Sequence, residues 1–282
     1  MALELNVDDL KLIRLLELKI ACELKRVCDL HDIKYSIAFG TMLGAVRHGG
    51  FIPWDDDIDI IMPKEDYSKF LYYAENEFSS EFQVVNYETN DECGEPFTKI
   101  MLRNTVFQEL FTEGTQAPNG VFVDIFPYDN RPDELWKALL HRFKNYELRK
   151  RILIASGYQF QKHGLKKIIY RLLWASTLIG KKKLITLYRS NQTRYDKAKT
   201  KRVVALGGNY GYEKDSIPAD WLDEYTTIQF ENTEFKVIKK YRDFLSHYYG
   251  DFMKLPPVED RVYKHKISQL DLTYYGGRKA HK

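Results

Sequence analysis

Apolar residues near the start of the chain recur at intervals of three and four, the spacing of one face of an α-helix. The positions on this face are Leu10, Ile13, Leu16, Ile20, Leu24 and Val27. They predict a long helix from Asp8 to about Leu30, with Asp8 or Asn6 as its N-cap.

The rest of the chain alternates between short apolar runs and longer amphipathic stretches. Strands are predicted over 35–39, 57–62, 82–87, 97–103, 106–110, 121–126 and 226–235. Helices are predicted over 42–47, 64–78, 133–155, 165–198 with a break near Gly180, and 237–249. Pro63, Pro127 and the pair Pro256-Pro257 are expected to end elements, because proline lacks the backbone N–H that a ladder or helix needs. This order predicts an α+β fold that becomes mostly helical in its second half.

The composition is that of a globular protein, and it excludes a fibrous, disordered or disulfide-stapled chain. Of the 282 residues, 44% are hydrophobic and 29% are charged, which is enough for a sizeable core. The cysteines Cys22, Cys28 and Cys93 form no CxxC or Cys/His cluster, which argues against a zinc ribbon. We see no signal-peptide pattern and no apolar run of about 18 residues, so we expect a cytoplasmic protein without a membrane span.

Charge is unevenly distributed along the chain, although the net charge is only +3. Residues 1–136 carry 12 Lys and Arg against 26 Asp and Glu, whereas residues 137–202 carry 19 against 2. An acidic first half can hold cations, and a basic middle can face the phosphates of a substrate, a lipid or a nucleic acid.

Aspartates crowd the predicted strand 57–62 and the turn before it. They are Asp55, Asp56, Asp57 and Asp59. Because side chains alternate along a strand, Asp57 and Asp59 project from the same side, and their like charges favour a cation between them. Asp124 lies mid-strand among apolar residues, where a carboxylate is costly unless it is paired or binds a metal. If the two strands are neighbours, the three carboxylates form a site for Mg²⁺ or Mn²⁺; the alternative is a solvated acidic turn.

Candidate phosphate contacts lie before and after this acidic segment. Gly40 and Thr41 follow a predicted strand directly and open a helix, where backbone N–H groups and the helix dipole suit a phosphate. A plain turn is the alternative. Arg47 and His48 end that helix and are expected to reach phosphate oxygens.

Two basic residues alternate with apolar ones on the predicted strand 97–103. Lys99 and Arg103 are therefore candidates for contacts to a diphosphate, and ordinary cross-strand ion pairs are the alternative. Trp54 stands beside the aspartates and could stack on a base or hold a quaternary ammonium, but we expect it to pack.

Three segments, in this order, resemble the LicD family. They are YSIAFGTMLGAVRHGGFIPWDDDIDIIMPKEDYSKF at 35–70, KIMLRNT…NGVFVDIFPYD at 99–129, and FKVIKKYRDFLSHYYGDFMKLPP…KH at 235–265. Residues from about 133 to 205 are unmatched. Family members resemble phosphocholine transferases that decorate bacterial teichoic acids and lipopolysaccharide, and fukutin and fukutin-related protein, which transfer ribitol phosphate, share the motif.

The resemblance implies a nucleotidyltransferase-like mixed sheet with flanking helices, in which a Gly-Ser pair and an Asp-x-Asp strand hold phosphates and metals. Gly40 and Thr41 take the place of the Gly-Ser pair, and Thr41 keeps the hydroxyl. Asp57 and Asp59 take the place of the Asp-x-Asp strand, and Asp124 that of the third carboxylate.

Other residues of the matched segments are expected to support the site without reacting. They are Trp54, Asp55, Asp56, Asp251 and His265. The sequence departs from the family at Ile238, where a proline often precedes the last helix. The zinc-finger insertion of fukutin-related protein is absent, in agreement with the cysteine count.

The implied reaction is metal-dependent transfer of a phospho-alcohol, foremost phosphocholine, from a CDP-alcohol to a hydroxyl of a teichoic acid, lipopolysaccharide or capsule precursor. CMP would leave, and Mg²⁺ or Mn²⁺ would be the cofactor. The alternatives are a CDP-ribitol or CDP-glycerol donor, a nucleotidyltransferase that releases pyrophosphate, and a non-catalytic adaptor that binds nucleic acid or membrane through the basic middle. The adaptor leaves the aspartates unexplained, so we expect no nucleic-acid partner.

Three regions follow from this interpretation. Residues 1–132 would form the catalytic core, 133–205 a basic helical region that faces the acceptor or a membrane, and 206–282 a segment that completes the site. Within 165–187, an apolar run at 168–179 is flanked by lysines at 166–167 and 181–183. Such a helix can lie peripherally on the anionic inner face of a membrane, or it can pack in the core.

Overall fold

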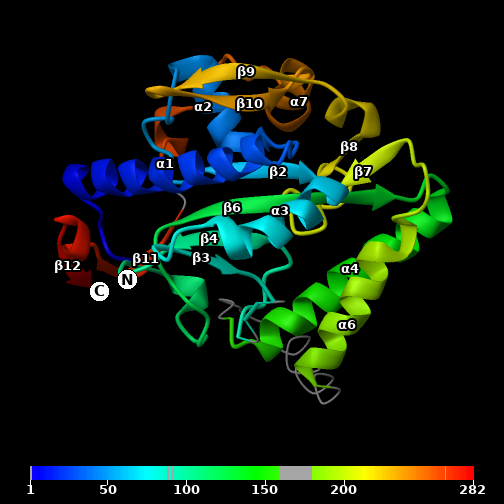
Figure 1. Ribbon diagram of the computed structural model, residues 1–282, viewed down its shortest axis with the longest axis horizontal. Coiled ribbons are helices and arrows are strands. Elements are labelled where there is room, and N and C mark those ends of the chain that lie inside the picture. Colours follow the sequence, from blue (N-terminus) through cyan, green and yellow to red (C-terminus); the bar gives the residue numbers. More distant parts are fainter. Residues whose placement is uncertain (1, 88, 91, 159–179, 264) are drawn as a thin grey trace.

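The computed structural model describes residues 2–87, 89–90, 92–158, 180–263 and 265–282 (Figure 1). Its centre is a seven-stranded sheet in the order β1-β2-β6-β4-β3, with β7 beside β6 and β8 beside β7. The strands are β1 (Ser36–Ile37), β2 (Asp59–Pro63), β3 (Phe82–Val85), β4 (Thr98–Leu102), β6 (Phe122–Arg131), β7 (Arg202–Val204) and β8 (Ser216–Pro218). The prediction of an α+β fold with a mixed sheet is confirmed.

The register of three central strands positions the charged residues. β2 and β6 are parallel and place Asp59 opposite Asp124, whereas β4 runs antiparallel to β6 and places Lys99 opposite Asp124. Pro127 does not end β6, contrary to the prediction. It falls between the residues that pair with β4 and those that pair with β7, so its missing N–H interrupts neither ladder.

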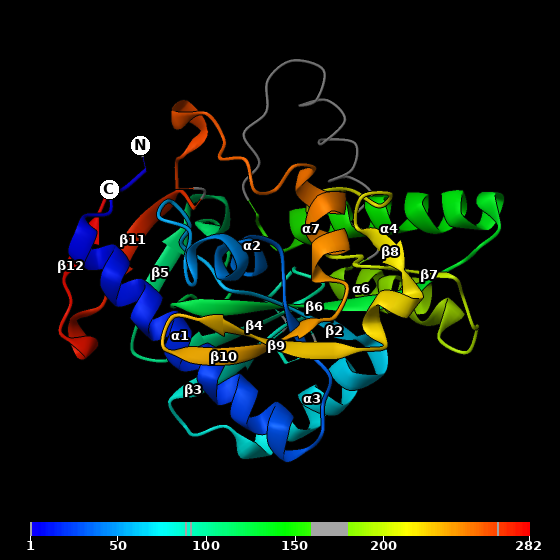
Figure 2. The same ribbon diagram turned by 90° about the horizontal axis from the view of Figure 1, so that it is seen from above.

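Helices cover both sides of the sheet. In Figure 2, α1 (Val7–Leu30) and α3 (Lys64–Glu77) lie on one side, and α2 (Phe39–His48) and α7 (Tyr241–Tyr249) lie on the other. The predicted apolar face of α1 is buried in the main core. Asn6 caps α1 in a reciprocal arrangement with Asp9, as the sequence predicts for that position.

Two further helices, α4 (Leu135–Ala155) and α6 (Lys181–Gln192), pack against each other beside the sheet (Figure 1). Residues 165–179 of the predicted helix over 165–198 lie outside the described residues. In α6, Leu184, Ile185 and Tyr188 are buried in a small core shared with Ile152 of α4. These three apolar positions of α6 therefore serve helix packing, whereas Leu187 is exposed. Among the described residues, no helix has the length and apolarity to cross a bilayer.

Two small sheets complete the fold. β9 (Tyr225–Phe230) and β10 (Thr233–Ile238) form a hairpin, and β11 (Ile267–Asp271) lies between β12 (Lys279–His281) and β5 (Val106–Glu109). Short 3₁₀ turns occupy Leu110–Thr112, Thr193–Tyr195, Ala219–Leu222, Val258–Asp260 and Thr273–Tyr275. Near the chain start, Asp9 binds Arg278 at 2.7 Å, so the two ends of the chain meet.

The C-terminal part of the chain differs from the sequence prediction in two ways. The predicted strand at 226–235 is the hairpin β9–β10, and because Val237 and Ile238 belong to β10, the helix predicted from 237 starts at Tyr241. The strands β7, β8, β11 and β12 were not predicted. β7 pairs with β6 and β8 with β7, whereas β11 pairs with β5 and β12, and such distant pairing leaves little trace in local sequence.

Candidate active site

Three of the predicted carboxylates converge because of the strand register. Asp59 opens β2 opposite Asp124 of β6, and Asp57 stands two residues before it. Burial and the negative charges of Asp57 and Asp124 raise the pKa of Asp59 well above its usual value. These carboxylates are thus close enough to repel one another, and the site favours added positive charge.

Lys99 supplies one such charge. Its Nζ donates to both carboxylate oxygens of Asp124, at 2.9 and 3.2 Å, and lies 3.3 Å from the centroid of the Phe122 ring. Burial raises the pKa of Asp124 to about 6, although the Lys99 ammonium lowers it. Although burial lowers the pKa of Lys99, the charges of Asp124 and Glu109 raise it overall. Of the two alternatives for Lys99, the structure shows the cross-strand ion pair.

The turn from β1 into α2 brings a hydroxyl to these carboxylates. Phe39 has a left-handed φ of 45°, which is rare for a non-glycine residue and turns the chain sharply. Gly40 has no room for a side chain, because a Cβ there would lie 2.3 Å from Oδ2 of Asp55. The Oγ1 of Thr41 accepts a 2.8 Å hydrogen bond from the backbone N–H of Asp59. The helix start is thereby fixed against β2, in the orientation that suits a bound phosphate.

The acidic loop before β2 is held by an arginine of α1. The Arg14 guanidinium donates to the carbonyl oxygens of Ile52, Pro53 and Asp55 at 2.7 to 3.1 Å. These bonds hold the loop against α1 while its carboxylates remain beside α2.

His265 reaches the same carboxylates from near the end of the chain. Its Nδ1 lies 3.0 Å from Oδ1 of Asp56, and its Nε2 lies 3.9 Å from Asp57 and 3.7 Å from Glu109. Although burial lowers the pKa of His265, the hydrogen bond to Asp56 and the charge of Asp57 raise it to about 10. The raised pKa favours the protonated ring, in which Nδ1 donates to Asp56 and the imidazolium adds a second positive charge.

The donor set suits a hard divalent cation but does not form a complete cage. Among the described residues, no three Asp, Glu, His or Cys side chains come together as a ready metal site. Lys99 holds both oxygens of Asp124, which leaves Asp57 and Asp59 as the carboxylates that could bind a cation. Magnesium is commonly held by one or two carboxylates together with substrate phosphates, so this pair fits it. The role of Asp124 as a third ligand stays a prediction.

Comparison with known proteins agrees with this geometry. The family model described as LicD/FKTN/FKRP, nucleotidyltransferase domain, matches residues 32–163. The lipopolysaccharide cholinephosphotransferase LicD of Haemophilus influenzae is 30% identical over 247 residues, which are 85% of this chain and 89% of that protein. The chain belongs to the LicD family. Membership gives the enzyme class, and the chain is a phosphotransferase.

Two uncharacterized Rickettsia proteins are also similar to this LicD-family chain. The protein of Rickettsia typhi is 32% identical over 121 residues, 42% of this chain and 36% of that protein. The protein of Rickettsia prowazekii is 61% identical over 36 residues, 13% of this chain and 14% of that protein. The LicD-family model covers the turn at Gly40 and all three carboxylates, whereas His265 lies beyond its matched residues.

Three predicted site residues of this LicD-family chain lie outside the carboxylate cluster. They are Arg47, Arg103 and Asp251. Arg47 donates to the carbonyl oxygen of Phe252 at 3.1 Å and ties α2 to the segment after α7. Arg103 follows β4, is exposed, and lies 3.4 Å from the side-chain oxygen of Gln83. Asp251 is exposed after α7. Among the described residues, none of these three forms a hydrogen bond or ion pair with Asp57, Asp59 or Asp124, although the charge of Asp55 acts on Arg47.

Trp54 packs, as the sequence analysis expected. Its ring lies edge-on to His48, at 6.1 Å between centroids, and the Arg261 guanidinium lies 5.2 Å from its centroid. Arg47 Nε donates to His48 Nε2 at 3.0 Å, so His48 belongs to the same surface cluster. This cluster supports the acidic loop from its outer side.

Glu17 of α1 is a buried carboxylate that the sequence analysis missed. Burial and the charges of Asp57 and Asp56 raise the pKa of Glu17 well above its usual value. Its Oε2 has no hydrogen-bond partner among the described residues. The sequence spacing could have indicated that Glu17 is buried. Glu17 lies four residues after Ile13 and three before Ile20, on the buried face of α1.

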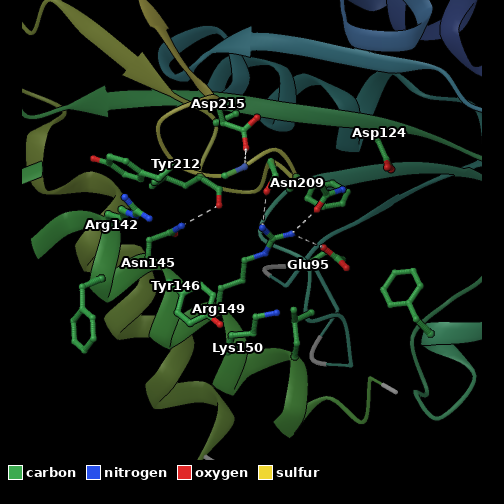
Figure 3. Close-up of a pocket in the computed structure, with 18 of the residues that line it drawn as sticks. Glu95, Asp124, Arg142, Asn145, Tyr146, Arg149, Lys150, Asn209, Tyr212 and Asp215 are labelled. Atoms are coloured by element: carbon green, nitrogen blue, oxygen red, sulfur yellow. Dashed lines mark hydrogen bonds and ion pairs between the residues drawn. The ribbon is translucent and has the colours of Figure 1, made fainter. Parts of the chain in front are cut away.

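A cavity of about 860 Å³ opens beside the Lys99–Asp124 pair (Figure 3). This volume lies within the ~300–1,000 Å³ that small-molecule sites commonly have. One end is lined by Lys99, Glu109, Asp124 and His265, and the facing wall comes from α4 and the loop before β8. Arg149 of α4 donates to the carbonyl oxygen of Gly208 at 2.8 Å. A carboxylate oxygen of Glu95 lies 3.9 Å from the Arg149 guanidinium. The LicD-family site thus consists of a carboxylate end and a basic wall around one cavity.

Proposed function

We propose that this chain transfers phosphocholine from CDP-choline to a hydroxyl of a lipopolysaccharide-type glycan, with Mg²⁺ or Mn²⁺ as cofactor. The observation that carries the proposal is the similarity to a lipopolysaccharide cholinephosphotransferase. The match covers 89% of that protein's length. The convergence of Asp57, Asp59 and Asp124 supports a phosphoryl-transfer site.

The donor would lie across the cavity, with its diphosphate near Asp59 and the start of α2. The N–H groups of Gly40 and Thr41 at the start of α2 would face a phosphate, since Gly40 has no side chain of its own to cover them. Arg142 and Lys150 on the α4 wall would add positive charge for the nucleotide or for an anionic acceptor.

In the transfer, the acceptor oxygen attacks the phosphorus that bears choline, and the bond from that phosphorus to the bridging oxygen breaks. CMP leaves with the bridging oxygen and its electron pair. Asp124, which lines the cavity, would accept the acceptor proton, and Lys99 would hold its carboxylate in place. A divalent ion on Asp57 and Asp59 would neutralise charge on the departing CMP.

The first test supplies a panel of donors with Mg²⁺ and a lipopolysaccharide acceptor. We expect CDP-choline to give CMP and labelled glycan, and CDP-glycerol and CDP-ribitol to give much less. Preference for another CDP-alcohol would change the donor while keeping the reaction class. Pyrophosphate as the main product, with CTP as the substrate, would favour the nucleotidyltransferase alternative.

The second test removes the metal ligands. Asp57→Asn and Asp59→Asn should each lose several orders of magnitude in turnover, as other disruptions of transition-state electrostatics do. Asp243→Asn makes the same charge change on the exposed side of α7 and should leave turnover unchanged. Full turnover in EDTA, or a ligand variant with more than about a tenth of the wild-type rate, would exclude the metal role.

A further inference from the structure

One face of α4 exposes a continuous set of large apolar side chains. Their exposed fractions lie between 43% and 71%, and the residues are Leu135, Trp136, Leu139, Leu140, Phe143 and Tyr146. At 3.6 residues per turn they fall within an arc of about 140°. Soluble surfaces rarely carry so large a contiguous apolar patch unless it binds something.

The opposite face of α4 is the one that packs in the fold. Ala138, His141, Asn145 and Ile152 are buried, and they recur at helical spacing. His141 Nε2 lies 3.1 Å from the carbonyl oxygen of Asn191 on α6, and Asn145 donates to the carbonyl of Leu206. These contacts fix the rotation of α4, so the apolar arc faces away from α6.

Positive charge surrounds this apolar arc. α4 carries six Lys and Arg residues against the single acidic residue Glu147. Lys137 and Lys144 lie past one edge of the arc, where Lys137 also pairs with Glu134 at 2.7 Å. Arg142 lies past the other edge, where the cavity opens. A helix face with leucine, tryptophan and phenylalanine flanked by cations is typical of segments that lie in the interface of an anionic membrane.

The apolar arc continues into the cavity described above. Leu139, Phe143 and Tyr146 belong to both, so the opening of the cavity lies beside the exposed face. A membrane surface under α4 would place headgroups and lipid-attached molecules at the opening of the cavity, across from its carboxylate end.

We infer that the apolar and basic face of α4 docks on an anionic phospholipid membrane. The apolar side chains enter the headgroup region, and the lysines and arginines bind lipid phosphates. The inference goes beyond the proposed reaction, and its test needs neither donor, acceptor nor metal. Failure of the membrane test therefore leaves the proposed reaction untouched.

The test is co-sedimentation of the full chain with vesicles. We expect binding to vesicles of phosphatidylcholine with phosphatidylglycerol at low salt, and much weaker binding to phosphatidylcholine alone. Leu135→Ser/Trp136→Ser/Leu140→Ser should lower the partition coefficient by about a hundredfold or more, since these side chains supply most of the buried area outside the cavity. Absence of wild-type binding would overturn the inference.

Matched variants separate this face from a general loss of apolar surface. Leu15→Ser/Leu30→Ser/Tyr72→Ser changes three comparably exposed residues on α1 and α3, and it should bind vesicles like the wild type. Equal losses in the two triple variants would contradict the inference.

Charge reversal tests the anionic part of the inference. Lys137→Glu/Lys144→Glu should weaken vesicle binding at least about tenfold at low salt. All variants should retain the wild-type circular dichroism and melting temperature. Concentration-dependent dimers without lipid that the α4 triple variant abolishes would assign the face to a second copy of the chain and overturn the membrane assignment.

Discussion

Removal of the Lys99 ammonium should show how strongly the stability of the protein depends on positive charge at the carboxylate site. Lys99→Met keeps the length of the side chain and its contact with the Phe122 ring, and it removes both hydrogen bonds to Asp124. Both side chains of the pair are about 11% exposed, so the charge left on Asp124 is buried. Loss of one partner of such a pair costs about 3–5 kcal/mol in free energy of unfolding.

The free energy of unfolding that Lys99→Met loses should depend on pH. The pKa of Asp124 already lies at about 6 in the folded state, above its usual value of 3.8, and without Lys99 it rises further. When folding raises the pKa of a carboxyl group, the protein loses free energy of unfolding as pH increases above the group's usual pKa of 3.8. The loss is up to ~1.4 kcal/mol per pH unit. The difference in free energy of unfolding between the wild type and Lys99→Met should therefore be smaller in acid and larger near neutral pH.

The assay is urea unfolding of Lys99→Met, Asp124→Asn and the double variant over a range of pH. The double variant should be more stable than Lys99→Met, because it no longer carries a buried unpaired carboxylate. Asp124→Asn should cost less than Lys99→Met, since Glu109 and Glu95 still stabilise the Lys99 charge. A loss below about 1 kcal/mol for Lys99→Met, or a double variant no more stable than it, would refute the reasoning.

Gly40→Ala should lower turnover at least about tenfold, because its Cβ would lie 2.3 Å from Oδ2 of Asp55 and displace that carboxylate; steady-state kinetics would show it. Thr41→Val should cost about 1–3 kcal/mol in urea unfolding because the buried N–H of Asp59 loses its acceptor, whereas Thr41→Ser should cost much less. Glu17→Gln should stabilise the protein, and its advantage in melting temperature should grow as pH rises above 4.5, since the pKa of Glu17 is raised by folding. An advantage that is constant with pH would mean that Glu17 does not titrate as described.

Local pattern in the sequence was sufficient for most of the elements and for part of the site. The helical spacing of α1 and the isolated Asp124 in β6 are encoded within a few residues of each position, and the structure has both. The alternation predicted for 57–62 is not kept in β2, which starts at Asp59 and buries Ile60, Ile61 and Met62 in succession. The motif at 35–70 likewise indicates the family from its residues alone. These features depend on side-chain periodicity and on short runs of residues, which neighbouring positions determine.

Contacts between distant segments could not be predicted in this way. Whether Lys99 would meet a phosphate or Asp124 depended on the antiparallel register of β4 and β6, and the sequence allowed both. His265 meets Asp56 across more than two hundred residues. Glu17 counts as part of the acidic site only because α1 packs beside the loop that follows α2.

The amino-acid sequence alone determined which residue types this protein can use: a carboxylate cluster, a glycine turn and a basic middle region. The tertiary structure decided how those charges are paired and which surface remains exposed. In α4 both faces carry apolar residues, and only its packing against α6 decides that Ile152 turns inward while Trp136 and Phe143 face outward. The physical reason is that local propensity specifies an element, whereas its register and rotation are set by the partners against which it buries its surface.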